Sequence, residues 1–155
     1  MTSDPSIRPS GVVDFELVFH LLPGMTLVLD PAFVILAQNA EHARATLSEG
    51  KNVVGQNLFA VFPDNPDHSA ADGVASVQAS LLRVLKTRQT DVMPPIRYDV
   101  KPARGPFQRR WWQITNTPIL GEDGYVRWII NRAEDVTEMV ELRAAAVKSE
   151  NDLLS

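Results

Sequence analysis

The chain has 155 residues, 45% of them hydrophobic and 22% charged, which is the composition of one globular domain and not of a disordered segment. It has no cysteine, so disulfides, thiolate nucleophiles and cysteine-based metal or iron–sulfur sites are excluded. A net charge of −4, a start without a secretory signal and the absence of an apolar run of about 20 residues favour a cytoplasmic protein that binds neither nucleic acid nor membrane.

The N-terminal part predicts one helix and one hairpin. Residues 1–10 contain two prolines and are expected to form a flexible lead-in. Residues 11–24 predict a short amphipathic helix that stops at Pro23-Gly24, because apolar side chains recur at helical spacing: Phe15, Val18, Phe19 and Leu22. The β-prone runs 25–30 and 33–38 flank the turn pair Asp30-Pro31 and predict two antiparallel strands.

Short helices are expected in the middle of the chain. Asn39 is in position to cap a helix over residues 40–47, and residues 51–55 and 57–63 predict two further helical turns. Ser69 and Asp72 have the spacing of a capping box and are expected to open the longest internal helix. One face of that helix is apolar and comprises Val74, Val77, Leu81, Val84 and Leu85.

Three strand-like runs follow the paired prolines 94–95, over residues 96–101, 107–118 and 125–132, with hairpin loops between them. The remaining residues are good helix formers without glycine or proline, which predicts a helix that leaves the domain. This order of elements favours the α+β class, with a five-stranded antiparallel sheet and short helices on one face.

Several segments in this order resemble a PAS sensor domain, most closely those ahead of bacterial histidine kinases and related signalling proteins. They are NAEHARAT, VVGQNLFAVFPDNP, the long amphipathic helix, WWQITNTPIL, the EDG turn and EDVTE. The resemblance implies a PAS domain over residues 25–138, with a flanking helix before it and the start of a signalling helix at 139–155. It also implies a homodimeric sensory module of a two-component system, without catalysis of its own, that is followed by an output domain such as a histidine kinase.

The same resemblance bears on cofactors. Photoactive flavin relatives carry a cysteine directly after a G-x-N motif, and Leu58 holds that position here, after Gly55-Gln56-Asn57. Oxygen-sensing haem relatives carry a histidine on the long helix, which has none here. Flavin bound without a covalent adduct stays open as the alternative, but we expect a colourless protein without haem or flavin, with room for an unknown small-molecule ligand. His20, His42 and His68 lack metal-ligand spacing, so we expect surface or core histidines and no metal.

Alternation along residues 107–118 places Trp112, Ile114 and Asn116 on the less polar face, which we expect to point inward. In PAS relatives this face lines the ligand cavity, so the resemblance implies a ligand-binding set: Tyr98, Val100, Trp112, Ile114, Asn116, Ile129, Asn131 and Ala133. Inward asparagines need hydrogen-bond partners, which either a ligand with its water or neighbouring protein groups can supply. Trp112 either stacks on a ligand or fills the core.

The signalling junction is expected at Asp135, Val136 and Thr137, where a strand must turn into a helix and short polar side chains can accept from free N–H groups. A weak heptad pattern in the last helix predicts a dimer seam of Met139, Leu142, Ala146 and Leu153. The PAS resemblance adds a second contact through the first helix, at Phe15, Val18 and Phe19. Alternatively, the first helix covers its own sheet, and the last is a frayed surface helix.

Two further interpretations remain open from the sequence. The basic cluster Arg104, Arg109 and Arg110 is either solvated charge or a contact to an anionic ligand or partner. The alternative function is a small cone-shaped α+β enzyme, for which Tyr98 and Asp99 are the adjacent acid–base candidates. Adjacent strand residues point to opposite faces, which argues against a shared catalytic site.

Overall fold

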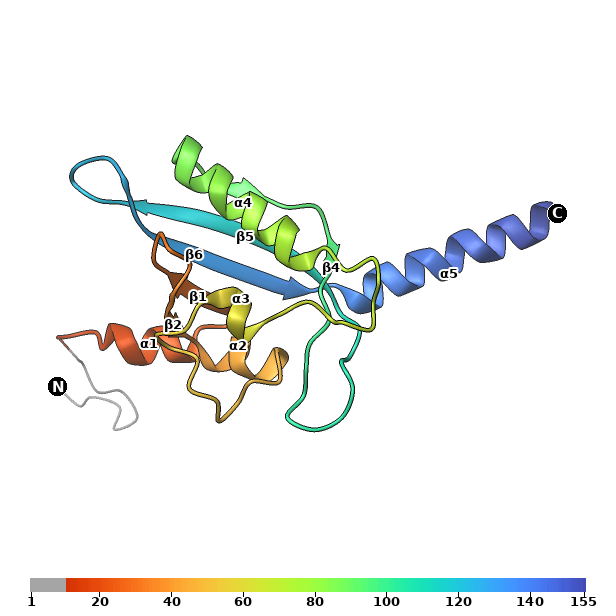
Figure 1. The fold of residues 1–155 in the computed structure, drawn as a ribbon, viewed down its shortest axis with the longest axis horizontal. Coiled ribbons are helices and arrows are strands. Elements are labelled where there is room, and N and C mark those ends of the chain that lie inside the picture. The colour runs from red at the N-terminus through yellow and green to blue at the C-terminus, as the bar shows by residue number, and fades with distance from the viewer. Residues whose placement is uncertain (1–10) are drawn as a thin grey trace, which may run out of the picture.

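An antiparallel sheet with helices on one face forms the body of the protein, and a last helix projects away from it (Figure 1). The computed structural model describes residues 11–155, so the predicted lead-in of residues 1–10 lies outside the described part. The elements in chain order are α1 Phe15–Leu21, β1 Met25–Leu29, β2 Ile35–Gln38, α2 Ala40–Ala45, α3 Leu58–Val61, α4 Gly73–Thr87, β3 Asp91–Val92, β4 Ile96–Arg97, β5 Trp111–Leu120, β6 Val126–Asp135 and α5 Thr137–Leu154. The strands follow the order β2-β1-β6-β5-β3, with β4 also paired to β5. The expected α+β class is confirmed.

The first hairpin forms because Asp30 organises its turn. One carboxylate oxygen of Asp30 accepts hydrogen bonds from the backbone N–H groups of Ala32 and Val34, both at 2.9 Å. These bonds hold the chain in a tight reversal, with Phe33 in the left-handed region at φ +67°. The predicted strands 25–30 and 33–38 are thereby confirmed as β1 and β2.

Two of the three expected short helices form, and the predicted cap Asn39 begins the first of them. Asn39 and Asn57 accept from backbone N–H groups at the starts of α2 and α3. The helical turn expected over residues 51–55 is wrong. Instead, the chain around Gly55 runs along the open edge of β2, where the N–H of Gly55 donates to the carbonyl of Ile35 at 2.7 Å. Backbone hydrogen bonds to the edge of the sheet are therefore favoured here over a local helical turn, and the local sequence does not reveal them.

Helix α4 has the predicted apolar face, since Val77, Leu81 and Val84 are buried against the sheet. Its predicted cap is wrong, because Ser69 lies in the turn before the helix. The carboxylate of Asp64, ten residues before the helix's second residue, accepts from the N–H of Val74 at 3.1 Å. A side chain from the preceding loop therefore accepts from a helix N-terminal N–H group, for which the sequence pattern predicts a local cap.

The sheet has one more strand than expected. Residues 96–101 were predicted as one strand, but the edge consists of two short strands, β3 and β4, on either side of Pro94-Pro95, and Val100 adds only a bridge to Gln108. Two consecutive prolines offer no N–H group to β5, which explains the interruption. β6 in turn runs to Asp135 and carries the sheet directly to α5.

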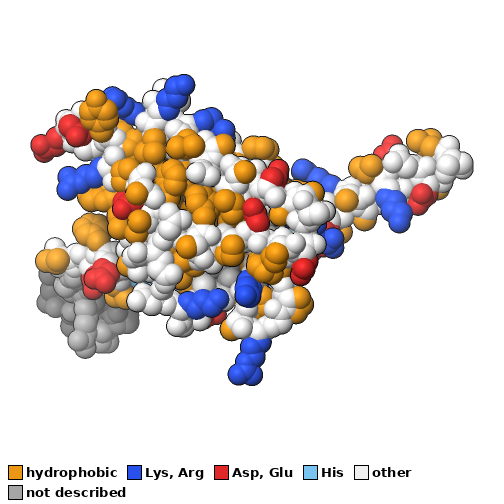
Figure 2. Space-filling model, viewed as in Figure 1, with side chains coloured by type: hydrophobic (Ala, Val, Ile, Leu, Met, Phe, Trp, Pro, Cys, Tyr) orange, Lys and Arg blue, Asp and Glu red, His pale blue; other side chains and the backbone are white. Residues whose placement is uncertain are grey.

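The core lies between the inner face of the sheet and helices α2 to α4. Leu27, Leu29, Ile35, Leu81 and Ile129 are fully buried there. By contrast, α5 has no buried residue and extends from the body with hydrophobic side chains among its charged ones (Figure 2). Among residues 11–155, no helix is both long and apolar enough to cross a lipid bilayer.

Candidate functional site

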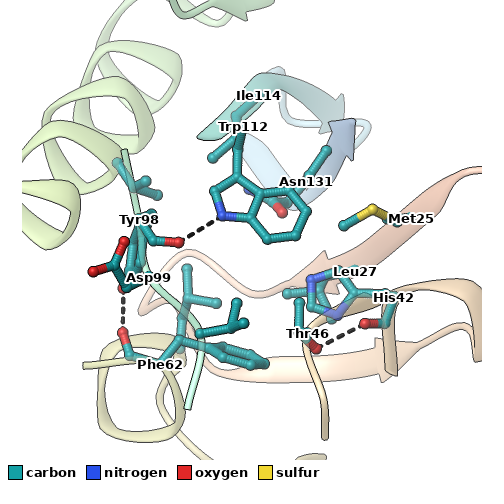
Figure 3. Close-up of a pocket in the computed structure, with 14 residues that line it drawn as sticks. Met25, Leu27, His42, Thr46, Phe62, Tyr98, Asp99, Trp112, Ile114 and Asn131 are labelled. Atoms are coloured by element: carbon teal, nitrogen blue, oxygen red, sulfur yellow. Dashed lines mark hydrogen bonds between the residues drawn. The ribbon is translucent and has the colours of Figure 1, made fainter. Parts of the chain in front are cut away.

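A cavity of about 60 Å³ opens between the inner face of the sheet and helices α2 and α3 (Figure 3). Such a volume holds a handful of water molecules, at roughly 10–15 Å³ of this measure for each. The lining comes from sheet, helices and the segment before β5, and comprises Met25, Leu27, His42, Thr46, Leu58, Phe62, Val77, Tyr98, Asp99, Val100, Trp112, Ile114, Asn131 and Ala133. An apolar cavity with a few polar groups is the usual form of a small-molecule site.

The structure brings most of the predicted ligand-binding residues together. Those that line the cavity are Tyr98, Val100, Trp112, Ile114, Asn131 and Ala133. Asn116 and Ile129 are fully buried on the same sheet face but are not part of the lining. Alternation thus found the inward face, whereas the position of the cavity along that face depends on how the helices lie over it.

His42 is the polar lining residue that the strand pattern could not supply. It lies on α2, three residues after the cap Asn39, and Thr46 follows one helical turn later. Residues at this spacing share one helix face. The face of α2 that carries His42 therefore points into the cavity, and helical spacing from Asn39 is the signal that could have identified it.

The ring of His42 is held in one tautomer by its neighbours. The side-chain Nε2 of Gln38 donates to His42 Nδ1 at 3.0 Å, so the ring proton sits on Nε2. Gln38 is itself fixed by a second bond to Ser48 Oγ at 2.9 Å, and the His42 ring meets Phe62 edge-on. Burial lowers the pKa of His42 to about 3, so the imidazole is neutral at physiological pH.

The buried asparagines find partners within the protein. Asn131 Nδ2 donates to Asn116 Oδ1 at 2.7 Å, and Asn116 Nδ2 donates to Ser80 Oγ on α4 at 2.9 Å. Ser80 Oγ donates to the carboxylate of Asp91 at 2.5 Å, and Asp91 forms an ion pair with Arg83 at 3.0 Å. Of the two explanations for inward asparagines, the structure supports neighbouring protein groups for Asn116, whereas Asn131 also borders the cavity.

One wall of the cavity is formed by Tyr98, Asp99 and Trp112. The Trp112 indole N–H donates to the carbonyl of Tyr98 at 2.7 Å, and the Tyr98 hydroxyl donates to the carbonyl of Phe62. Burial and the nearby Asp64 carboxylate raise the pKa of Tyr98, which keeps it neutral. Trp112 is held as a fixed wall of the cavity.

Asp99 is engaged by several donors. It accepts from Arg97 at 3.0 Å, from Asn65 Nδ2 at 2.9 Å and from the backbone N–H of Arg110 at 3.4 Å. Burial raises the pKa of this carboxyl, but the hydrogen bonds from Arg97 and Asn65 outweigh burial and hold it below its ordinary value. Tyr98 and Asp99, the candidate acid–base pair, are thus both occupied in structural hydrogen bonds.

The junction to α5 lies directly beside the cavity wall. The backbone N–H of Trp111 donates to Thr137 Oγ1 at 2.9 Å, and its carbonyl accepts from the N–H of Val136 at 2.9 Å. The Thr137 hydroxyl donates to Asp135 Oδ1 at 2.6 Å. Asp135, Val136 and Thr137 therefore form one hydrogen-bonded turn that ties β5 and β6 to the first turn of α5.

The basic cluster lies at the same junction and outside the cavity. Arg109 forms an ion pair with Glu141 of α5 at 3.2 Å, and Arg110 lies 3.7 Å from the carboxylate of Asp135. Arg104 is exposed in the loop before β5. Within residues 11–155 there is no group of three or more His, Asp or Glu side chains that could hold a metal ion.

The antiparallel sheet, the helices on one face, the central cavity and the exit helix together form the architecture that the sequence resemblance implies. Residues 19–141 match the family described as PAS fold, and the chain belongs to that family. The resemblance found in the sequence is thereby confirmed, as is the fold class. None of the curated protein sequences matches the chain significantly.

Solved structures give the same result at the level of fold. The sensory box sensor histidine kinase from Vibrio cholerae is 20% identical, with a TM-score of 0.53 over 79% of this chain and 88% of that chain. The PAS domain of nitrogen regulation protein NR(II) from Vibrio parahaemolyticus is 16% identical, with a TM-score of 0.58 over 80% and 99%. An RNA-binding Light-Oxygen-Voltage receptor is 17% identical, with a TM-score of 0.65 over 94% of this chain and 40% of that chain. The chain thus contains a PAS domain, and its fold is similar to that of the PAS domains in these sensor proteins.

Proposed function

We propose that this chain is the sensory and dimerisation domain of a bacterial signal-transduction protein, with a histidine kinase as its output partner. In this proposal residues 25–138 form the PAS domain, residues 11–24 the flanking helix and residues 139–155 the start of the signalling helix. A small polar metabolite occupies the cavity, and the domain passes its state to the output through α5.

The observation that carries this proposal is the adjacency of two tryptophans on β5. Trp112 is a wall of the cavity, and the neighbouring residue Trp111 holds both Val136 and Thr137 at the start of α5. Because the Trp112 side chain is anchored, a ligand that presses on it would displace the Trp112 backbone and, through the shared planar peptide bond, Trp111. Trp111 alone therefore separates the cavity wall from the residues that begin the exit helix, and it couples ligand binding to that helix.

The cavity also guides the choice of ligand. Its volume of about 60 Å³ is far below the ligand-site range of roughly 300–1,000 Å³, so a flavin or haem would require large displacements of the lining. We therefore propose a ligand of few heavy atoms and no coloured cofactor.

Homodimerisation is supported by the apolar surface at both ends of the domain. On α1, Phe15 is 77% exposed and Val18 is also exposed, while Phe19 is half-buried. On α5 the proposed seam residues are all exposed: Met139, Leu142, Ala146 and Leu153. Exposed side chains of this size at helical spacing are typical of a surface that a second chain covers.

Native mass spectrometry tests the ligand-binding part of the proposal. The purified chain is incubated with a bacterial small-molecule extract beside two variants, the cavity-facing Ala133→Leu and the exposed Ala79→Leu on α4. We expect an added small-molecule mass on wild type and on Ala79→Leu, and none on Ala133→Leu, because the larger side chain fills the cavity. An unaltered mass for all three proteins would contradict a ligand-binding cavity.

A further inference from the structure

A one-directional chain of hydrogen bonds runs from the surface to the cavity. At the outer end, Arg83 holds the carboxylate of Asp91 through two bonds of 3.0 Å. From Asp91 the chain passes inward through Ser80, Asn116 and Asn131 by bonds of 2.5, 2.9 and 2.7 Å. Asn131 is the member of this chain that lines the cavity.

The carboxylate at the outer end fixes the direction of every bond in the chain. The hydrogen bonds from Arg83 and Ser80 hold the pKa of Asp91 below its ordinary value, so Asp91 is ionised and can only accept. Ser80 must therefore give its single proton to Asp91 and accept from the Asn116 amide nitrogen. Asn116 then presents its oxygen to Asn131.

As a result, the amide of Asn131 has one defined orientation. Its Nδ2 is turned towards Asn116, which leaves Oδ1 as the group offered to the cavity. No hydrogen-bond donor among residues 11–155 is bonded to this oxygen. Since no fully buried side-chain atom in the described residues lacks a partner, the oxygen must be accessible from the cavity. Asn131 therefore supplies the cavity with an acceptor.

His42 supplies the complementary group from the opposite wall. Because Gln38 donates to Nδ1, the ring proton lies on Nε2, and no described side chain accepts from it. Figure 3 shows the ring of His42 on α2 facing the sheet residues Trp112 and Asn131 across the cavity. The cavity thus has one preset donor and one preset acceptor.

The charges of the lining disfavour an ionic ligand. Asp99 is the one ionised side chain among the described lining residues, and Arg97 already compensates it at 3.0 Å. His42 is neutral, so an anion would meet a carboxylate and no cation in this cavity. A cation would compete with Arg97 for a carboxylate whose hydrogen bonds are already made.

We propose that the cavity takes a small uncharged molecule with both a hydrogen-bond donor and an acceptor, of the amide or lactam class, and that Asp91 is the positioning residue for this choice. The ligand N–H donates to Asn131 Oδ1 and its carbonyl accepts from His42 Nε2–H. This inference rests on the proposed function, since it specifies the ligand of the same cavity.

Three matched probes test the ligand class by NMR titration of the ¹⁵N-labelled chain. 2-Pyrrolidone has a donor and an acceptor, cyclopentanone has the same ring size without the donor, and propionate is an anion. We expect 2-pyrrolidone to shift the His42 ring and Asn131 side-chain signals. Loss of one neutral hydrogen bond should weaken cyclopentanone roughly 2- to 10-fold, and propionate should not bind.

The variant Asp91→Asn tests the role of Asp91. An asparagine at this position can donate to Ser80, so the Ser80 hydroxyl can turn to Asn116, and the amides of Asn116 and Asn131 can reverse. Asn131 would then offer its NH₂ group to the cavity, and the preference for 2-pyrrolidone over cyclopentanone should disappear or invert. Asp152→Asn, which removes the same charge from the far end of α5, should leave the preference unchanged.

The outcomes separate this inference from the proposed function. Equal or tighter binding of propionate would overturn the uncharged class, while the cavity would still be a ligand site. An unchanged probe preference in Asp91→Asn would overturn the positioning role, because a merely structural change would weaken both probes alike. If no probe binds, the amide class is wrong, and native mass spectrometry still decides whether the cavity holds a ligand.

Discussion

Single polar residues tie the helices of this domain to its sheet. Asn39 is fully buried, and its Oδ1 accepts from the N–H groups of Thr26 and His42, both at 3.0 Å. Its Nδ2 donates to the carbonyl of Gly24 at 2.7 Å. Asn39 therefore caps α2 and also fixes α2 to the start of β1, which is what places His42 at the cavity.

The buried His42 gives a first prediction, on pH. A pKa of about 3 in the folded state, against 6.5 for the free side chain, means that the unfolded chain binds an extra proton between these values. Stability contributed by neutral His42 is present above about pH 6.5 and is lost as pH falls towards 3. Wild type should lose about 2 kcal/mol more unfolding free energy than His42→Gln between pH 7.5 and 5, measured by urea denaturation.

For each protein, the change in unfolding free energy is taken relative to its own value at pH 7.5. Comparing these changes removes the effect of the substitution on packing. His20→Gln, at an exposed position on α1, serves as the matched control and should follow wild type. Identical pH dependence in wild type and His42→Gln would show that the His42 ring is not held neutral by burial.

Gly73 gives a second prediction, on packing at the start of α4. A Cβ built at this buried glycine would lie 2.7 Å from Tyr98 Cδ2 and 3.2 Å from Asp64 Oδ1. The Tyr98 ring cannot retreat easily, because its hydroxyl is bonded to Phe62. Overpacking of about 1–3 kcal/mol should exceed the helix-propensity gain of at most about 1 kcal/mol, so Gly73→Ala should lower the free energy of unfolding.

Urea denaturation measures this effect, with Gly11→Ala as the control. A Cβ at Gly11 meets nothing within 4 Å, so this variant should unfold like wild type. A Gly73→Ala protein as stable as wild type would mean that the Tyr98 ring yields without loss.

At the scale of elements, the sequence predicts structure that depends on neighbouring residues. It does not predict structure that depends on contacts between residues far apart in the chain. The side-chain cap at Asn39, the Asp30 turn and the alternation of β5 are local, and each follows from the sequence. The cap of α4 comes from Asp64 and not from Ser69, because the preceding loop folds back over the helix start. No local pattern contains such a contact.

The candidate site divides in the same way. Alternation identified the inward residues of β5 and β6, since strand period alone decides the face. It could not place His42 in the cavity, because that depends on how α2 lies over the sheet. Nor could it show that Asn116 bonds to Ser80, thirty-six positions earlier, so it left the partner of that amide open.

The junction between β6 and α5 gives a third prediction. Thr137→Val keeps the side-chain shape but removes the oxygen that accepts from the Trp111 N–H. Loss of a hydrogen bond of about 1 kcal/mol should speed exchange of the Trp111 amide roughly fivefold, measured by native-state hydrogen exchange against Ile114 as internal reference. Thr137→Ser keeps the oxygen and should retain protection. Equal exchange in both variants would rule out the Thr137 hydroxyl as a junction contact.

At the scale of the whole molecule, the first and last helices lie at opposite ends of the body. Figure 1 shows α1 near the N-terminal end and α5 projecting from the other. Neither α1 nor α5 contains a buried residue, and within residues 11–155 each leaves exposed apolar side chains, among them Phe15 and Leu142. A single two-fold dimer that uses both helices must therefore pair the protomers along their whole length.

This arrangement gives the last prediction, on oligomeric state. An isolated helix of the length of α5 is marginal in water, so a partner chain should stabilise its exposed seam. We expect wild type to sediment as a dimer at micromolar concentration, and Phe15→Glu and Leu142→Glu each to shift it towards monomer, since each places a charge in an apolar contact. Both positions are well exposed, at 77% and 63%, so neither substitution should unfold the monomer. Val92→Glu, at an equally exposed apolar position on β3, is the matched control and should remain dimeric. A wild-type monomer would remove the dimer, and a dimer that is weakened only by Val92→Glu would place the interface on the β3 edge of the sheet.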